Sequence, residues 1–381
     1  MLRRLRLLTA GESHGASLTV VLEGIPAGLE VDLEFLVSEL RRRQRGYGRG
    51  PRASTTADTV EVAGGVVKGR TTGAPLALRI PNPGAEGGSP ERPLTIPRPG
   101  HADLPGAMKF GLSDMRLVWE RASARETASR VAAGAICKAL LSLIGVRVGS
   151  HVTSIGSVWA LDIPEDIEEA LGRAENSPVR CADPEAERAM VEEIDRARER
   201  GDTLGGTFEV VALGVPPGLG SYAQFDQRLD ARLAASVMSI PSVKAVEIGG
   251  GFSTSTLPGV VAHDPILPSQ SGPPRRGANR AGGVEGGISN GEPVVVRAGV
   301  KPVPTLGEPM ASVDLSTGEP KRAPVLRGDV CVVPAAAVVG EAMVALVLAD
   351  SALEKFGGDT VEEFVAAFKR YARRIGWEGG E

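Results

Sequence analysis

The chain has 381 residues, of which 42% are hydrophobic and 24% charged, with a formal net charge of −4. This composition is typical of a globular protein, and the nearly balanced charge argues against a polyanionic partner such as nucleic acid. Three cysteines (Cys137, Cys181 and Cys331) are too few and too widely spaced for a disulfide framework or a zinc site, so we predict no metal and a reducing compartment.

The sequence contains no uninterrupted run of about 18 apolar residues, so we expect no membrane span. Its start, MLRRLRLLTAGES, places arginines before leucines as a signal peptide does. The apolar part is too short for a signal and is better explained by a first strand. We therefore expect a cytoplasmic protein.

In the first part of the chain we expect two strands, a helix and a hairpin or meander. The strands are predicted over 4–9 and 17–23, on either side of the turn GESHG (11–15). The helix is predicted over 32–44 with Asp32 as its N-cap, and the hairpin or meander over 59–80.

The middle of the chain opens with a long Pro- and Gly-rich loop over 81–106. The clearest helix then begins at Ser123, where Glu126 three residues later predicts a capping box, and Gly145 is its expected stop. A charged helix over 183–201 is expected to lie on the surface.

The last part of the chain alternates helices, strands and glycine-rich loop without the regular pattern of a doubly wound sheet. We expect a helix at 225–241, a strand at 243–249, a loop at 249–291, a strand from 292 leading into a Pro-rich turn, and helices at 334–350 and 359–374. With no linker and no repeat, the prediction is one α+β domain over residues 1–381.

The GESHG turn is a candidate site because glycines let the backbone turn sharply or approach a ligand closely. His14 within it can act as an acid or a base near neutral pH. The alternative is an ordinary turn with a surface histidine.

A basic, glycine-rich segment, LRRRQRGYGRGPR, covers residues 40–52. It carries six arginines: Arg41, Arg42, Arg43, Arg45, Arg49 and Arg52. Guanidinium groups bind carboxylates and phosphates bidentately, and the glycines favour a small anion held by an ordered loop. A solvated helix end, or a nucleic-acid patch with Tyr47, is the alternative.

Two further segments combine arginines with other polar groups. RPGHADLPG places His101 beside Arg98 and Asp103, although a loop histidine is often merely exposed. ERASARET places Arg121 and Arg125 at a helix start, where backbone N–H groups favour an anion. A well-capped structural helix explains the second segment equally well.

The small-residue segments RAGGVEGGISNG (280–291) and KPVPT (301–305) lack the spacing of a phosphate-binding or dinucleotide-binding loop. They can pack against a flat cofactor or simply turn. In LRGDVCVVP, Asp329 is a candidate base, helix cap or salt-bridge partner.

Taken in order, these segments resemble the chorismate synthase family. The matching motifs run from about residue 7 to beyond 345 and are GESHG, RRRQRGYGRG, RPGHAD, ERASARET, VKAVEIGGGF, NRAGGVEGGISNG, KPVPT and RGD. The resemblance implies a β–α–β sandwich, in which antiparallel sheets surround a helical layer, and assembly as a homotetramer.

The resemblance also implies a reaction. Family members are carbon–oxygen lyases that remove phosphate from 5-enolpyruvylshikimate 3-phosphate by 1,4-anti elimination, giving chorismate at the last common step toward the aromatic amino acids. They require reduced FMN without net redox change. Some reduce their own flavin with NADPH, and others rely on an external reductase. We see no added domain for NADPH and expect the dependent type.

Site residues follow from the resemblance position by position. His14 matches the acid that protonates the departing phosphate, His101 the histidine that protonates the reduced flavin, and Asp329 the group that removes the C6 proton. The expected substrate contacts are Ser13, Arg43, Arg49, Arg98 and Arg125, of which Arg43 and Arg49 match positions also assigned to NADP. The expected flavin contacts are Arg121, Ala122, Ser123, Pro241, Ser242, Gly286, Lys301, Pro302, Val303, Pro304, Thr305 and Arg327.

Two positions depart from the family pattern. Pro241-Ser242 stands where the family often has Asn-Ala or Gln-Ala, and Gly328 replaces a serine beside Asp329. Neither departure removes an acid–base group. We expect the motifs to meet in one arginine-lined cleft. The competing readings are a flavin-independent phosphohydrolase or lyase using His14 and Asp329, and a non-catalytic anion- or RNA-binding protein.

Overall fold

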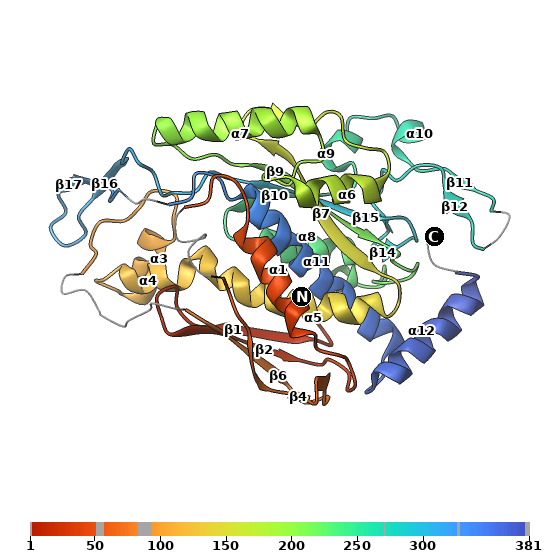
Figure 1. Ribbon diagram of the computed structural model, residues 1–381. Coiled ribbons are helices and arrows are strands. Elements are labelled where there is room, and N and C mark those ends of the chain that lie inside the picture. The colour runs from red at the N-terminus through yellow and green to blue at the C-terminus, as the bar shows by residue number, and fades with distance from the viewer. Residues whose placement is uncertain (1, 51–56, 83–92, 270–271, 326–327, 378–381) are drawn as a thin grey trace.

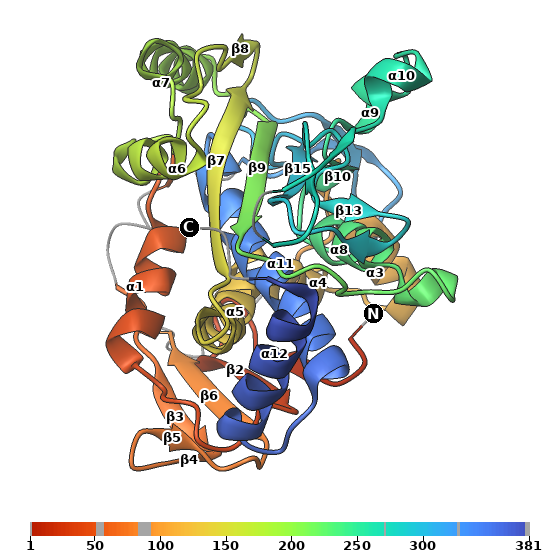
Figure 2. The same ribbon diagram turned by 90° about the vertical axis from the view of Figure 1, so that its right-hand side faces the viewer.

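The structure is a computed structural model that describes residues 2–50, 57–82, 93–269, 272–325 and 328–377. Two antiparallel sheets lie on opposite sides of a layer of helices (Figures 1 and 2). The α+β sandwich predicted from the sequence is confirmed, while its organisation as one domain over 1–381 stays a prediction.

The smaller sheet has the strand order β1-β2-β6-β3. Its strands are β1 (Arg6–Ala10), β2 (Ser17–Glu23), β6 (Leu76–Pro81) and β3 (Glu61–Gly64). Alternate residues of β2, Leu18, Val20 and Leu22, are buried against the helices, as expected for a strand with one covered face. A short hairpin, β4 (Val66–Val67) with β5 (Arg70–Thr71), extends this end of the molecule.

The larger sheet has the order β10-β15-β9-β7-β8. Its strands are β10 (Val243–Ile248), β15 (Val294–Val300), β9 (Gly206–Leu213), β7 (Arg147–Ile155) and β8 (Val158–Trp159). The sequence analysis predicted β10 and β15 but did not predict β7 and β9, which form the centre of this sheet.

Four helices form the layer between the sheets: α1 (Leu33–Gln44), α5 (Thr127–Ser142), α8 (Leu229–Met238) and α11 (Val333–Phe356). Helix α11 lies at the centre and packs on α5 so closely that a Cβ on Gly134 would lie 2.3 Å from the Cβ of Ala342. By length and composition α11 could cross a membrane, but its apolar stretch is 100% buried inside the protein. Glu341 and Asp350 interrupt that stretch, and both are fully buried.

The remaining elements lie outside this layer. The helices are α3 (Asp103–Phe110), α4 (Arg116–Ala122), α6 (Ile167–Asn176), α7 (Pro184–Glu199), α9 (Gly251–Thr254), α10 (Gly259–Ala262) and α12 (Val361–Ile375), with one-turn 3₁₀ helices η1 (Ala124–Glu126) and η2 (Phe225–Gln227). Three further hairpins are β11 (Ile266–Leu267) with β12 (Arg275–Arg276), β13 (Val284–Glu285) with β14 (Ile288–Ser289), and β16 (Ala311–Val313) with β17 (Pro320–Arg322).

The predicted capping box at the start of α5 is wrong. The Ser123 hydroxyl accepts from the backbone N–H of Arg125 and so caps η1, and α5 begins afterwards at Thr127. The Glu126 carboxylate instead bonds Thr9 at 2.8 Å and the arginine one turn later on α5. The local pattern was correct, but long-range partners compete for the glutamate.

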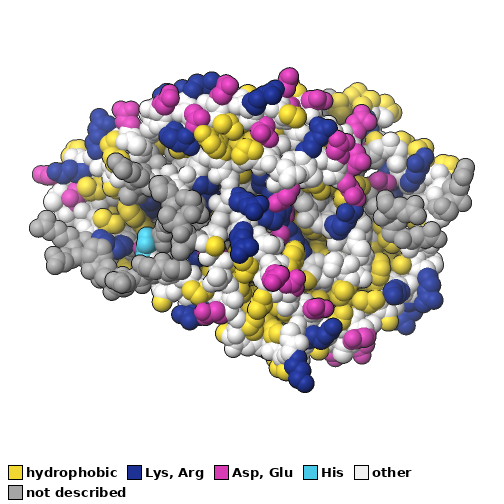
Figure 3. All heavy atoms as spheres, in the orientation of Figure 1, with side chains coloured by type: hydrophobic (Ala, Val, Ile, Leu, Met, Phe, Trp, Pro, Cys, Tyr) yellow, Lys and Arg dark blue, Asp and Glu magenta, His cyan; other side chains and the backbone are white. Residues whose placement is uncertain are grey.

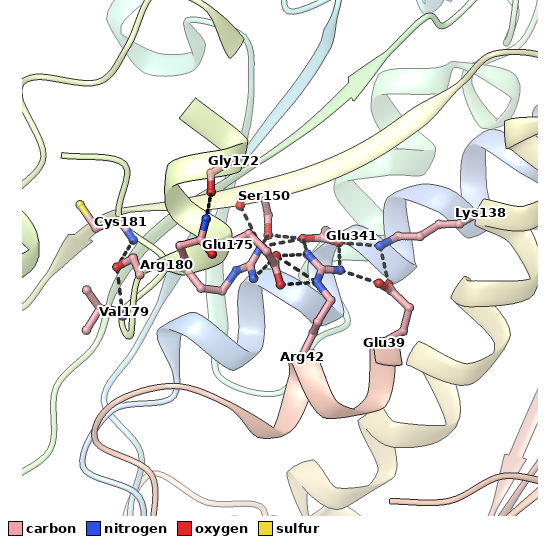
Figure 4. Close-up of polar contacts among 12 residues, drawn as sticks. Glu39, Arg42, Lys138, Ser150, Gly172, Glu175, Val179, Arg180, Cys181 and Glu341 are labelled. Atoms are coloured by element: carbon pink, nitrogen blue, oxygen red, sulfur yellow. Dashed lines mark hydrogen bonds and ion pairs between the residues drawn. The ribbon is translucent and has the colours of Figure 1, made fainter. Parts of the chain in front are cut away.

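A buried ionic cluster fastens the end of α1 to the core (Figure 4). The Glu341 carboxylate of α11 accepts from Arg42 at 2.7 Å and Lys138 at 2.5 Å, and Arg180 and Ser150 contact its other oxygen at 3.1 and 2.6 Å. Burial alone would raise the pKa of Glu341, but these cations hold it well below its ordinary value. The cluster therefore fixes the last turn of α1, in which Arg43 follows Arg42.

Candidate active site

The GESHG loop packs against α4 through one glutamate. The backbone N–H of Ser13 donates to the Glu120 carbonyl at 3.0 Å, and the N–H of His14 donates to the Glu120 carboxylate at 2.6 Å. The same carboxylate lies 2.7 Å from Nδ1 of His14. Because the imidazole is 66% exposed, Glu120 orients a histidine that remains accessible to a ligand.

The end of α4 also lies beside this loop. The hydroxyls of Ser123 and the buried Ser13 are 3.3 Å apart. Arg121 donates to the carbonyl and hydroxyl of Thr9 at 3.0 and 2.9 Å. The predicted flavin positions Arg121, Ala122 and Ser123 therefore adjoin the predicted substrate residue Ser13.

His101 belongs to a buried triad with Arg98 and Asp103. Arg98 donates to both oxygens of Asp103, at 2.8 and 3.0 Å, and Nδ1 of His101 meets the same carboxylate. Nδ1 also lies 2.9 Å from Arg98, but arginine only donates and a carboxylate only accepts, so Nδ1 cannot satisfy both. The closer contact with Asp103 favours the proton on Nδ1, leaving Nε2 as the atom for exchange with a ligand.

The Asp103 carboxylate at the centre of the triad is held in its charged form. Burial alone would raise the pKa of Asp103, but hydrogen bonds from His101 and Arg98 hold it well below its ordinary range. The Arg98 guanidinium also stacks 3.8 Å above the ring of Trp119 in α4, which fastens the triad to the helix that bears Glu120.

The 301–305 turn lies against the loop that carries His101. Lys301 donates from Nζ to the carbonyl of Gly100 at 3.0 Å, and its backbone N–H donates to Ser242 at 2.9 Å. Burial and the nearby Lys244 lower the pKa of Lys301. The contacts bring the Pro241-Ser242 pair, the turn and His101 into one neighbourhood.

The far end of this turn meets the loop before α11. A Cβ on Gly328 would lie 2.7 Å from the hydroxyl of Thr305, so any larger residue at this position would force the turn to shift. Asp329, the next residue, accepts from the N–H of Gly50 at 2.7 Å, and its carboxylate lies 3.4 Å from Nε of Arg49. Glycine at 328 thus permits a close approach between the turn and the basic loop.

Arg43 has the least compensated charge in this region. It is 5% exposed, and burial together with Arg49 and Arg125 lowers its pKa to about 10, although Asp58 and Asp329 act in the opposite direction. Within the part of the chain that the structure describes, Nε of Arg43 and Nε of Arg49 are buried without a hydrogen-bond partner. Nε of Arg49 still lies within ion-pair distance of the Asp329 carboxylate, 3.4 Å away. Buried donors are normally paired, so the Nε of Arg43 is the atom that best fits an anionic ligand.

Arg125 connects the basic loop to the GESHG loop. One of its nitrogens donates to both oxygens of Asp58 at 2.7 Å, and its Nε donates to Asn82 at 2.9 Å. The amide nitrogen of Asn82 in turn donates to the carbonyls of Glu12 and Gly15 at 3.2 and 2.8 Å.

These interactions close into a circle that we call the contact ring. In order, its members are the GESHG loop, α4, the loop 98–103, the turn 301–305, Gly328–Asp329, the loop 43–50, Asp58, Arg125 and Asn82. Figure 3 shows Lys and Arg side chains and one histidine among the grey residues at the left of this face. The ring joins anion-binding groups to three groups able to transfer a proton: His14, His101 and Asp329.

Among the described residues, one predicted site residue is not brought into the contact ring. Gly286 lies in the tight turn between β13 and β14, and this hairpin adjoins Pro293 just before β15, whereas Lys301 follows the other end of that strand. Arg327 lies outside the described residues. Of the six arginines in the basic segment, Arg42 forms an ion pair with Glu341 in the buried cluster. Arg52, like Arg327, lies outside the described residues.

No group of three or more His, Cys, Asp or Glu side chains suited to a metal ion occurs among the described residues.

Comparison with known proteins shows the family of the chain. The family model for chorismate synthase matches residues 5–353. The chain belongs to the chorismate synthase family. It is 50% identical over 381 residues to chorismate synthase of Carboxydothermus hydrogenoformans, covering 97% of this chain and 99% of the relative. It is 51% identical over 383 residues to chorismate synthase of Desulforudis audaxviator, covering 97% and 98% respectively.

A solved structure described as "Crystal Structure of Chorismate Synthase" matches with a TM-score of 0.83 at 43% identity, covering 98% of this chain and 99% of that one. The resemblance drawn from the motifs and the fold class it implied are therefore confirmed. Membership of the chorismate synthase family makes the chain an enzyme with a small-molecule substrate.

Three residues of the contact ring were not predicted from the sequence: Asp58, Asn82 and Glu120. Asp58 and Asn82 are single polar residues near ordinary strands, in TTADTV and RIPNP. Glu120 lies within α4 and is the first residue of ERASARET, so a recognised motif was an available signal for it. Asp58 and Asn82 gain their importance from partners 67 and 43 residues away, which no local pattern reveals.

Proposed function

We propose that the chain converts 5-enolpyruvylshikimate 3-phosphate to chorismate by 1,4-anti elimination of phosphate, as a carbon–oxygen lyase at the last common step toward the aromatic amino acids. The observation that carries the proposal is the buried Nε of Arg43 within the contact ring, which has no hydrogen-bond partner among the described residues. The substrate has two carboxylates and a phosphate, which are the ligands that guanidinium groups pair with best.

The arginines of the contact ring divide into two kinds. Arg43 and Arg49 have unused donors and are the expected direct contacts of the substrate anions. Arg98 and Arg125 already pair with Asp103 and Asp58, so their first role is to hold neighbouring groups. Their remaining donors can still reach a bound anion.

Each proton in the elimination has an available group. The C–O bond to phosphate breaks, its electron pair leaves with the phosphate, and His14, oriented at Nδ1 by Glu120, donates a proton to that leaving group. The C6–H bond also breaks, and the Asp329 carboxylate takes the proton, while the remaining electrons complete the new diene of the ring. The N–H of Gly50 and the guanidinium of Arg49 hold the Asp329 carboxylate in place.

The residues present fit a flat, anionic cofactor, which we propose to be reduced FMN. Lys301 and Arg121 supply cationic groups, and His101 offers Nε2 from a triad that is fixed at Nδ1. Bound there, reduced FMN would supply transient electron density to the substrate without net oxidation. His101 would protonate the reduced flavin. An external reductase would supply the reduced FMN, with NADPH as the indirect source of electrons.

The test is an anaerobic assay with photoreduced FMN and 5-enolpyruvylshikimate 3-phosphate. We expect chorismate and phosphate in equal amounts and only when the flavin is reduced. His14→Ala, His101→Ala and Asp329→Asn should each lower kcat by about 100-fold or more, as expected for loss of a proton-transfer group.

Phosphate release without reduced FMN would instead identify a flavin-independent phosphohydrolase or lyase. Undiminished rates in the His14→Ala and His101→Ala enzymes would remove their proton roles. Tight RNA binding that weakens steeply with salt would favour the nucleic-acid alternative.

A further inference from the structure

Asn82 is buried and uses its whole side chain to join two parts of the contact ring. It is 8% exposed and directly follows β6. Its amide nitrogen donates to two carbonyls of the GESHG loop, at Glu12 and Gly15, and its amide oxygen accepts from Arg125. Its backbone N–H adds a bond to the carbonyl of Ala16 at 3.0 Å.

These partners demand a side chain that both donates and accepts. Two carbonyl oxygens require N–H donors, while the guanidinium requires an oxygen acceptor, and a carboxamide supplies both from one planar group. An aspartate in the same place would turn an acceptor toward the carbonyls of Glu12 and Gly15 and leave them unsatisfied. The position therefore discriminates between two side chains of nearly equal size.

Asp58 continues the connection toward the basic loop. It is 4% exposed, holds Arg125 through both carboxylate oxygens, and donates its backbone N–H to the side chain of Gln44 at 3.1 Å. Gln44 is the last residue of α1 and follows Arg43 directly. A continuous path of hydrogen bonds thus runs from the end of α1 to the loop that carries His14.

We propose that Asp58, Arg125 and Asn82 form a positioning chain that fixes the GESHG loop, and with it His14, relative to Arg43. Its consequence for catalysis rests on the proposed function, in which Arg43 binds the substrate anion and His14 protonates the leaving phosphate. Asn82 and Asp58 contact neither the substrate anion nor the leaving phosphate in this proposal. Both are therefore positioning residues, and they act mainly on kcat.

The first measurement is kinetic. In Asn82→Asp the loop loses two donors, and we expect kcat to fall about 10- to 100-fold while KM changes less than about threefold, because the anion-binding arginines stay in place. Asp58→Asn keeps the shape but removes the charge that holds Arg125, and we expect a smaller fall in kcat in the same direction. A rise in KM with unchanged kcat in both variants would overturn the proposal.

The second measurement needs no activity. Hydrogen exchange of the peptide covering 8–17 should quicken about tenfold or more in Asn82→Asp and Asp58→Asn, because the loop opens more often. If wild type fails to make chorismate, the proposed function falls while this measurement still tests the chain. If wild type is active and exchange in both variants matches it, the chain is refuted.

Thr71→Val is the matched control. Thr71 is 6% exposed, and its hydroxyl also joins backbone groups of a loop, accepting from Leu29 at 2.9 Å and donating to Pro26 at 2.6 Å. That loop carries no candidate site residue. We expect Thr71→Val to lower the melting temperature without changing kcat or the hydrogen exchange of residues 8–17. If Thr71→Val changed kcat and exchange as much as Asn82→Asp does, Asn82→Asp would be acting only through stability.

A double variant tests whether the residues act as one chain. Once Asn82→Asp has released the loop, Asp58→Asn has little left to disturb. The kcat of the double variant Asp58→Asn/Asn82→Asp should therefore lie within about twofold of the kcat of Asn82→Asp alone. Losses in kcat that multiply would mean that the two residues act independently, which contradicts the proposal.

Discussion

At the scale of single residues, the site depends on charges that the protein itself leaves incompletely compensated. Arg43 is buried among two other arginines and two carboxylates, and its Nε has no partner among the described residues. Burying a charged donor without a partner costs free energy, and a bound anion would offset that cost. We therefore expect the free enzyme to bind an anion at this position.

Arg43→Ala should weaken substrate binding more than it slows the bound complex. Loss of a charge-assisted bond to a phosphate or carboxylate is worth about 2 kcal/mol, so KM should rise about 30-fold. Arg43→Lys should recover only part of the substrate affinity that Arg43→Ala loses, because an ammonium group cannot bind bidentately. Arg41→Ala, an exposed position on the same helix, is the control and should leave KM unchanged. Equal values of KM for wild type and Arg43→Ala would exclude Arg43 from the substrate site.

Asp103→Asn should impair His101 and remove an acid-sensitive stabilisation. The pKa of Asp103 is lowered in the folded protein, so its contribution to stability is present above the ordinary range of aspartate, about pH 4, and is lost as pH falls below it. Urea unfolding should therefore show wild type more stable than Asp103→Asn at pH 7, with the difference shrinking toward pH 3. Asp226→Asn, at an exposed position, should show no such trend.

Single residues also mark how far sequence reasoning reached into the site. His14, His101, Asp329 and their neighbouring arginines stand in motifs that can be read locally. Glu120 is the first residue of ERASARET, yet that motif does not reveal its role, and Asn82 lies in no motif. Both act on backbone groups that they meet only after folding, 106 residues away for Glu120 and 67–70 residues away for Asn82.

At the scale of elements, the helix layer was easier to predict than the larger sheet. Helices α1 and α7 have clear side-chain caps, from Asp32 as expected and from Asp183, and α11 is a long apolar run led by a proline. Strands β7 and β9 were missed. On β7, serines at 150 and 154 are buried and satisfied by side-chain partners, so the alternation of apolar and polar residues that identifies a half-buried strand is absent.

Glu341→Gln tests the cluster that holds α1 against α11. The substitution leaves three buried or partly buried cations around a neutral amide, so unfolding should become easier by about 3–5 kcal/mol. Glu168→Gln breaks an exposed pair with Arg147 and should cost less than about 1 kcal/mol. Denaturant midpoints at equal slope measure both, and equal small losses would mean that the buried cluster does not stabilise the layer.

The same variant carries a functional expectation. Because Arg43 directly follows Arg42, loosening the last turn of α1 should also raise KM, even though Glu341 lies in the core and outside the contact ring. Glu168→Gln should leave KM unchanged.

At the scale of the whole molecule, large apolar side chains remain exposed on a projecting arm. This arm, residues 251–267, includes α9, α10 and β11 (Figure 2), and exposes Phe252 by 76%, Val260 by 93% and Ile266 by 66%. Contiguous exposed apolar surface usually marks an interface. Together with the expectation of a homotetramer, these exposed side chains lead us to predict that the arm packs on another copy of the chain.

Light scattering after size-exclusion chromatography should give four times the chain mass of 39.6 kDa. Val260→Asp should shift the mass toward smaller species, because a charge would be buried at the interface. Lys68→Glu, on the β4–β5 hairpin at the opposite end of the molecule (Figures 1 and 2), should leave the mass unchanged. A tetramer unaffected by Val260→Asp would place the interface elsewhere.

Helix α11 is the surface on which both halves of the sandwich assemble, yet it is encoded in the last eighth of the chain. During synthesis the ribosome therefore releases nearly every strand of both sheets before the helix that will cover them. The apolar faces of both sheets are therefore exposed for most of translation, and a nascent chain in this state is prone to aggregation. A chaperone that binds exposed apolar segments during translation would therefore benefit this enzyme more than a protein whose central helix emerges first.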